Sequence, residues 1–295
     1  MKKLLKFMIV FILLLTLFIS CMSLYVGNYL YDYTLNPYSK KNISEKIDTN
    51  EEIAQESRQW LNEYGEEVYI QSEDNLKLHG YFIEQDNPVY MIMVHGYRGD
   101  GASIISPIKK MKKQGYNLII PDLRGHGLSD GDYIGMGWDD RLDILAWIDY
   151  ILDRDKNASI VLYGVSMGGA TVMNVAGEDC GYTSVWDIFK THIDMDNLTS
   201  DVALHMASFT TKLRAGYYLE DVKPIEQVKK SKVPMLFIHG GKDTFVPKEM
   251  VDELYEAATC EKEKLIIEKA GHANSCSVDS ELYYQTIFKF IDKYI

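Results

Sequence analysis

The chain has 295 residues, of which 46% are hydrophobic and 25% are charged. These values are ordinary for one large or two small folded domains, and they exclude wholesale disorder. The formal net charge of −12 argues against nucleic acid as a partner, because such binding depends on neutralising phosphates.

The first predicted element is an apolar segment behind a basic tip. Lys2, Lys3 and Lys6 precede residues 7–31, which carry no charge. About 20 helical residues cross the hydrocarbon core of a bilayer, so this segment predicts a membrane-spanning helix. The lysines favour a cytoplasmic N-terminus, which places the rest of the chain outside. We therefore predict a single-pass signal anchor over residues 1–33.

Two alternatives to an uncleaved anchor stay open. A cleaved signal peptide of a secreted protein needs a short apolar core and a small-x-small cleavage site, and neither is clear here. A lipoprotein signal would place the lipid on Cys21 after Ser20, although Phe18 stands where such signals usually have leucine. An interfacial aromatic belt typically follows a membrane span, and four tyrosines lie there: Tyr25, Tyr29, Tyr31 and Tyr33.

Residues 34–65 are polar and charged, and they predict a membrane-proximal linker that passes into a helix ending near residue 62. From residue 66 the pattern predicts an antiparallel hairpin, then an alternation of strands and helices over residues 66–295. The expected later strands are 89–94, 116–121, 159–164, 233–239 and 264–268. The expected helices are 104–114, 138–153, 167–176, 247–258 and 279–295. The class is therefore α/β, with a mostly parallel sheet and helices on both faces.

Two finer expectations concern helical segments. In the helix over 138–153 we place five residues on the apolar side: Leu142, Leu145, Ala146, Ile148 and Ile151. The segment at about 184–232 interrupts the alternation with a helical pattern rich in large apolar residues. We predict that it forms a helical cap over the carboxyl edge of the sheet.

A candidate nucleophile lies between the strand over 159–164 and the next helix. Gly164-Val165-Ser166-Met167-Gly168 fits the G-x-S-x-G pattern in its strand–turn–helix setting. Such a turn leaves no room for side chains on either side of the serine, hence the glycines. Ser166 would stand at a helix N-terminus, where partial positive charge favours an oxyanion.

A nucleophilic serine needs a base, and the base needs an orienting acid. Asp243 directly follows the strand over 233–239, and His272 directly follows the last strand. Both lie at the carboxyl ends of strands, where open α/β sheets place their ligand sites. The chain order Ser, Asp, His is the one that accompanies this elbow. We predict Ser166, Asp243 and His272 as the catalytic residues.

The oxyanion hole requires two backbone N–H groups, for which we predict those of Met167 and Tyr97. Tyr97 follows His95-Gly96 at the end of the strand over 89–94. His95 is a rival candidate for the base, but its position suits ordering of this loop better. Arg124 and His126 follow the next strand, and they either shape the adjacent loop or touch the substrate.

Together these segments resemble the α/β-hydrolase superfamily. The motifs that carry the resemblance are HGYRGD, PDLRGHGLSDGDYIGMG, GVSMGG, HGGKDTFVP and AGHA. The resemblance is nearest to bacterial membrane-anchored hydrolases of the serine aminopeptidase and prolyl-oligopeptidase-like branch. It implies a serine hydrolase whose triad is Ser166, Asp243 and His272, working through an acyl-enzyme without a metal or organic cofactor.

The chain departs from this pattern after the helix that follows Ser166. Only residues 177–179 stand where the family has a linker and a strand, so the strand between those of the nucleophile and the acid is missing. Its loss would either narrow the sheet and move Asp243 towards Ser166, or leave a gap.

Three functions remain in competition. The apolar cap favours a carboxylic ester with an acyl or aromatic group as the small-molecule substrate. A serine peptidase of the aminopeptidase or prolyl-oligopeptidase type is the alternative, because an acidic outer surface suits a cationic peptide N-terminus. The missing strand motivates a third hypothesis, a surface-tethered binding protein without turnover. A nucleotide-binding enzyme is excluded, since neither G-x-G-x-x-G nor a P-loop is present.

Overall fold

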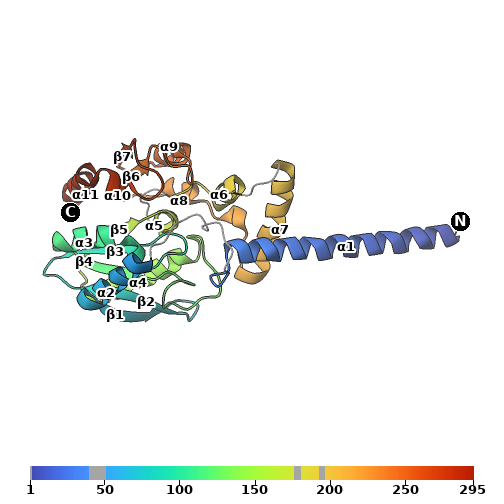
Figure 1. Ribbon diagram of the computed structural model, residues 1–295, viewed down its shortest axis with the longest axis horizontal. Coiled ribbons are helices and arrows are strands. Elements are labelled where there is room, and N and C mark those ends of the chain that lie inside the picture. The colour runs from blue at the N-terminus through green and yellow to red at the C-terminus, as the bar shows by residue number, and fades with distance from the viewer. Residues whose placement is uncertain (1, 40–50, 176–180, 193–196) are drawn as a thin grey trace.

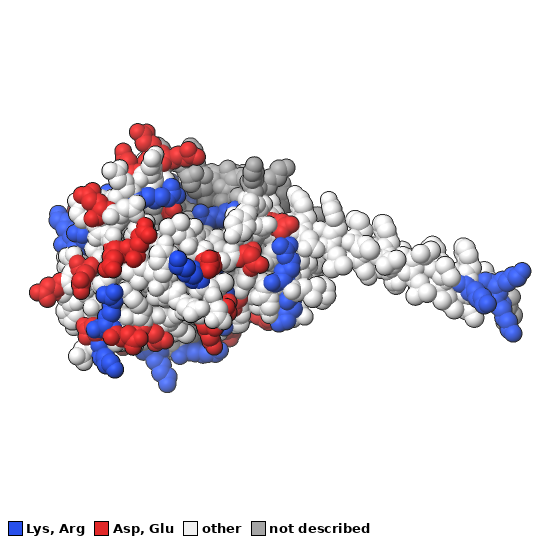
Figure 2. All heavy atoms as spheres, turned by 90° about the horizontal axis from the view of Figure 1, so that it is seen from below, with Lys and Arg blue, Asp and Glu red and all other residues white. Residues whose placement is uncertain are grey.

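The computed structural model describes residues 2–39, 51–175, 181–192 and 197–295. The chain begins with α1 (Lys2–Thr34), a 33-residue helix that projects from one end of the folded body (Figure 1). By length and composition, α1 is capable of crossing a membrane. Figure 2 shows its basic tip, an uncharged shaft and then a body whose visible face carries both acidic and basic side chains.

The larger of two sheets has five strands in the order β1-β2-β4-β3-β5. It follows α2 (Glu51–Tyr64), and the predicted hairpin is its antiparallel edge. β4, β3 and β5 run parallel to one another, as expected of strands that are linked by helices. The strands are β1 (Glu66–Gln71), β2 (Lys77–Ile83), β3 (Val89–Val94), β4 (Asn117–Pro121) and β5 (Ser159–Gly164).

The smaller sheet consists of two parallel strands, β6 (Met235–Gly240) and β7 (Lys262–Ile267). Among the described residues no strand joins β5 to β6, and the two sheets are separated by a gap rather than merged into one narrower sheet. Residues 177–179, where the sequence predicts the loss of a strand, lie outside the described residues. A cavity of about 320 Å³ lies in this gap, and apolar side chains of both sheets line it, including Leu162 and Ile238.

Helices cover both faces of the sheets, as predicted. On β3, Tyr90, Ile92 and Val94 belong to one core cluster, and Met91 and Met93 belong to the other, because successive side chains of a strand point to opposite faces. The first cluster includes α4 (Asp140–Arg154), α5 (Met167–Val175) and α9 (Lys248–Ala257). The second includes α3 (Ile105–Lys113), which follows the 3-10 turn η1 (Gly101–Ile104), and α11 (Ser280–Tyr294), which follows the short α10 (Ser275–Val278).

α11 contacts residues on both sides of the gap. The Tyr283 hydroxyl lies 2.8 Å from the hydroxyl of Tyr163 on β5. Ile287 and Phe290 line the cavity together with residues of β5 and β6. The two sheets are therefore held in register by helix packing and not by a backbone ladder.

The segment predicted as a cap is helical. It contains α6 (Val185–His192), α7 (Asn197–Ala215), the 3-10 turn η2 (Leu219–Asp221) and α8 (Pro224–Val228). α7 packs against α1 and lies across the end of the body from which α1 projects (Figure 1).

The predicted apolar side of α4 is right at Ile151, which is buried, and wrong at Leu145. Leu145 is 46% exposed, and the buried residues include Ile144 and Trp147 with two carboxylates, Asp140 and Asp143. Asp143 is tolerated on this buried face because it pairs with a buried arginine from the loop after β4.

Candidate active site

Ser166 stands in a strained turn between β5 and α5. Its φ of +56° is unusual for a residue with a side chain. A Cβ on Gly164 would lie 2.3 Å from the carbonyl oxygen of Gly168, and one on Gly168 would lie 2.3 Å from that of Val94. Only glycine fits on either side of the serine, which is the geometry of a nucleophile elbow.

The three residues predicted as catalytic converge although they come from two sheets. Ser166 Oγ lies 2.8 Å from Nε2 of His272, and Nδ1 of His272 lies 2.8 Å from Oδ2 of Asp243. Asp243 follows β6, and His272 follows β7. The first distance is within the reach that proton transfer from serine to histidine requires, and the second is a hydrogen bond that can orient the histidine.

Asp243 is placed to orient the imidazole. Its Oδ1 accepts the backbone N–H groups of Phe245 and Val246, each at 2.8 Å. Burial opposes its ionisation, but the hydrogen bond from His272 and these N–H groups hold the pKa of Asp243 below its ordinary value. The carboxylate therefore keeps the proton of His272 on Nδ1 and leaves Nε2 free to accept one.

A second histidine, His239, lies 3.6 Å from the same carboxylate. Its Nε2 lies 3.0 Å from the carbonyl oxygen of Val246 and donates to it, and burial lowers the pKa of this imidazole. His239 is thus a neutral neighbour that supports the turn carrying Asp243.

The loop after β3 passes directly over the nucleophile. A Cβ on Gly96 would lie 3.4 Å from Cβ of Ser166, so this backbone approaches closely. His95 donates from Nδ1 to the Gly96 carbonyl oxygen at 2.8 Å and accepts the Leu123 N–H at Nε2, at 3.0 Å. Burial lowers the pKa of His95. Both of its nitrogens are occupied, which suits ordering of the loop and leaves neither to serve as a base.

The next two residues of this loop connect it to the end of α1. The Tyr97 hydroxyl donates to the carbonyl oxygen of Thr34 at 2.6 Å. Arg98, at φ +55°, donates to the carbonyl oxygens of Asn36 (2.6 Å), Pro37 (3.2 Å) and Ser39 (3.1 Å). Sequence reasoning missed Arg98, although it stands within the HGYRGD motif. Its partners lie some 60 positions earlier, where no local pattern indicates them.

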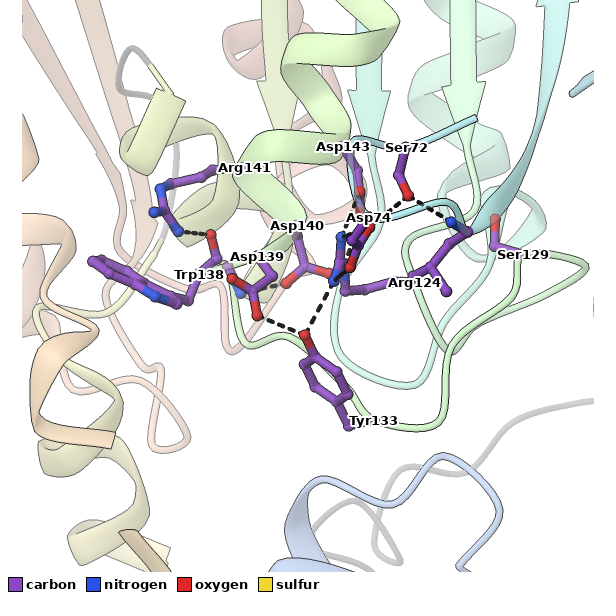
Figure 3. A network of polar contacts seen from close by, with 12 residues as sticks. Ser72, Asp74, Arg124, Ser129, Tyr133, Trp138, Asp139, Asp140, Arg141 and Asp143 are labelled. Carbon is purple, nitrogen blue, oxygen red and sulfur yellow. Dashed lines mark hydrogen bonds and ion pairs between the residues drawn. The ribbon is translucent and has the colours of Figure 1, made fainter. Parts of the chain in front are cut away.

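Arg124 is a structural residue and makes none of its described contacts with the triad. Its guanidinium makes two bonds of 2.7 Å to Asp143 and further bonds of 3.0 Å to Asp74 and to the Tyr133 hydroxyl (Figure 3). His126 is similarly engaged, because its Nε2 accepts the backbone N–H of Arg98 at 3.1 Å. Burial lowers the pKa of His126 to about 3, so it is neutral. Of the two roles open to this pair, the geometry favours shaping the loop.

The cap reaches the site through a row of rings that sequence reasoning also missed. The ring of Phe245 lies 4.8 Å from that of His272, and the ring of His192, at the end of α6, lies 4.1 Å from Phe245. His192 also contacts the Phe245 carbonyl oxygen through Nε2, at 3.0 Å. These contacts form an aromatic wall beside the imidazole.

Models of two serine hydrolase families match parts of this chain. Residues 86–186 match the model of the serine aminopeptidase (S33) family, and residues 189–273 match that of the serine hydrolase (FSH1) family. The chain is similar to YqkD of Bacillus subtilis, an uncharacterised protein (26% identity, covering 72% of this chain and 74% of that one). It is also similar to YfhR of Salmonella typhimurium, likewise uncharacterised (28% identity, 77% and 81%).

Among solved structures, the esterase Pf2001 of Pyrococcus furiosus shares the fold. The TM-score is 0.65 at 23% identity, and the alignment covers 80% of this chain and 94% of the esterase. The two family models meet near the cap, and each carries part of the site. The first includes Ser166, and the second includes Asp243 and His272.

Proposed function

We propose that this chain, a hydrolase of the α/β-hydrolase superfamily, cleaves carboxylic esters through a serine acyl-enzyme. The observation that carries the proposal is the unbroken relay from Ser166 Oγ through His272 to Asp243, with both links at 2.8 Å. The relay persists although the sheets that supply its members are separate.

The geometry indicates a reaction in two halves. His272 takes the Ser166 proton on Nε2 as Oγ attacks the acyl carbonyl carbon, and the backbone N–H groups of Met167 and Tyr97 stabilise the oxyanion. The imidazolium then gives this proton to the leaving alkoxide, which departs as the alcohol. Water attacks the acyl-enzyme with His272 again as base, the acid is released, and Ser166 recovers its proton.

A fluorophosphonate probe tests the nucleophile in the full chain, purified in detergent. Wild type is expected to be labelled, and Ser166→Ala is expected to lose labelling, because Oγ is the attacking atom. His272→Gln should react far more slowly, whereas His205→Gln, at a side chain 67% exposed on α7, should match wild type. Equal labelling of wild type and Ser166→Ala would overturn the assignment.

The ester bond is favoured over the peptide bond by the aromatic wall of His192 and Phe245, which places two rings beside His272 where an acyl or aromatic group of the substrate could pack. The match to a serine aminopeptidase model supports the alternative, a peptidase. Turnover of p-nitrophenyl esters together with aminoacyl p-nitroanilides distinguishes the two. Faster hydrolysis of the anilides would reverse our preference.

The hypothesis of a binding protein without turnover rested on the missing strand. That strand is absent from the described residues, yet Ser166 and Asp243 each lie within hydrogen-bond distance of His272. The reason for proposing a binding protein therefore no longer holds.

We further propose that α1 anchors the enzyme in the membrane with the catalytic domain outside. The basic tip and the apolar length of α1 support this topology. In cells, the chain should resist carbonate extraction and should be cleaved by external protease. Release of a shortened soluble chain would favour a cleaved signal, and a lipid on Cys21 would favour a lipoprotein.

A further inference from the structure

We propose that α7 is an interfacial helix that lies on the bilayer crossed by α1, with its exposed apolar face seated among the lipid headgroups. We define this face by Val202, Met206, Phe209 and Leu213. The proposal rests on α1 as the anchor and does not depend on the hydrolase activity.

The face has the spacing of a helical stripe, since its members are four, three and four positions apart. Val202 is 48% exposed, Phe209 50% and Leu213 63%, while Met206 is half-buried. The opposite side of α7, which includes Leu204 and Thr211, is buried against the body. An exposed row of large apolar side chains typically marks a surface that contacts lipid or another protein.

The contact between α7 and α1 determines which way the exposed face of α7 points. α7 crosses α1 at Gly27, where a Cβ would lie 2.2 Å from Oγ1 of Thr210 and 2.5 Å from the carbonyl oxygen of Met206. An ion pair of 3.0 Å between Arg214 and Asp32 fixes the crossing. Because α7 lies across the end of the body from which α1 projects, the side of α7 opposite the body faces along α1 (Figure 1).

The depth of the crossing matches that of a membrane surface. The apolar part of α1 that stands clear of the body runs to Leu24, and 20 or so helical residues span about 30 Å, the thickness of the hydrocarbon core. Tyr25 and Tyr29 follow on α1, 70% and 59% exposed, where aromatic residues mark the interface. Gly27 lies between them, so α7 is held at interfacial depth.

The charges near α7 favour insertion of apolar side chains over attraction to anionic lipid. Arg214 is already paired with Asp32, and the Lys212 ammonium donates to the carbonyl oxygen of Gly216 at 2.6 Å. The partner that fits is therefore the surface of a zwitterionic bilayer. A second copy of the chain would have to pack around the projecting α1 to cover the same face.

Quenching by brominated phosphatidylcholine tests the proposal in the full chain, reconstituted in phosphatidylcholine vesicles. An indole is introduced by Phe209→Trp on α7, by Leu14→Trp within α1, and by Leu282→Trp on α11. Leu282 is a matched control, because it is 43% exposed and α11 lies at the end of the body remote from α1 (Figure 1). The signal is the fluorescence lost in excess of that of wild type, whose four native tryptophans provide the background.

We expect quenching of the indoles at 14 and 209, several-fold greater than that at 282. Quenching at 14 with none at 209 would overturn the docking of α7 and leave the anchor intact. Absence of quenching at 14 would overturn both. An indole at 209 that is shielded from aqueous acrylamide yet untouched by bromolipid would indicate a protein on this face, and would equally overturn the proposal.

Discussion

The two sheets of this hydrolase supply the site in different ways. In the five-stranded sheet, β3 and β5 form a continuous parallel ladder, and the turns after them place the Gly96 loop against Ser166. In the two-stranded sheet, β6 and β7 pair with each other and with no other strand of the described residues, and the turns after them carry Asp243 and His272. Backbone hydrogen bonds therefore set the strain at the nucleophile, whereas packing across a gap sets its distance to the base. Four predictions test this contrast, from the largest expected effect to the smallest.

The largest effect should follow Asp243→Asn, which leaves the fold of the smaller sheet in place. The amide cannot hold His272 in the tautomer that accepts a proton, so kcat is expected to fall by about 10⁴. Ester hydrolysis by the full chain measures it. Asp252→Asn is the control, because this carboxylate pairs with Lys264 on the same two-stranded half but lies away from His272. A loss of less than about tenfold in Asp243→Asn would contradict the role assigned to the acid.

The second prediction compares an isoleucine-to-alanine substitution at the gap between the sheets with the same substitution beside the larger sheet. Ile287→Ala enlarges the cavity between the sheets, and Ile108→Ala truncates a buried side chain of α3, which packs on β4 and does not line that cavity. Each should lower the free energy of unfolding by about 2–5 kcal/mol. Only Ile287→Ala should also lower kcat, by up to about 10²-fold, because the base shifts relative to Ser166. Equal kcat in the two variants would show that α11 does not align the sheets.

The third prediction concerns Asp140, which is buried on the five-stranded side. Burial raises the pKa of Asp140 to about 7, so between its ordinary value of 3.8 and 7 the folded chain binds a proton that the unfolded chain releases. The stabilisation that this proton brings is full at low pH and is lost as pH rises towards 7, by at most about 1.4 kcal/mol per pH unit.

Urea unfolding at pH 5, 6, 7 and 8 measures this effect against Asp140→Asn, which does not titrate. The advantage of the variant over wild type should grow with pH while kcat stays unchanged. A constant difference between the two proteins would refute the raised pKa.

The smallest effect is expected at the end of α1. Tyr97→Phe removes the hydroxyl that bonds the Thr34 carbonyl oxygen, and it should cost about 1 kcal/mol of stability. The backbone N–H of residue 97 remains, so kcat should stay within about twofold. Tyr64→Phe, at a tyrosine 46% exposed on α2, should cost almost nothing. A large fall in kcat in Tyr97→Phe would instead show that the end of α1 positions the oxyanion loop.

The predictions that failed concern residues whose contacts come from segments far away in the sequence. The elbow around Ser166 was predictable because its glycine pattern lies within five residues, although the backbone that Gly168 approaches belongs to Val94. The buried face of α4 was not predictable, because Asp143 is a charged residue on that face and its buried partner, Arg124, lies in a separate loop. Arg98 escaped notice for the same reason, since the carbonyl oxygens that it binds belong to a distant segment.

The sequence by itself determined the α/β class, the elbow and the loss of a strand, because each is written in local spacing and in the number of residues between elements. It left open whether that loss would narrow the sheet or leave a gap. Only the tertiary structure shows that the two sheets are separated by a gap. α11 lies across this gap, where Tyr283 contacts Tyr163. The physical reason is that side-chain packing between elements more than 100 residues apart sets the spacing of the sheets, and no local pattern encodes it.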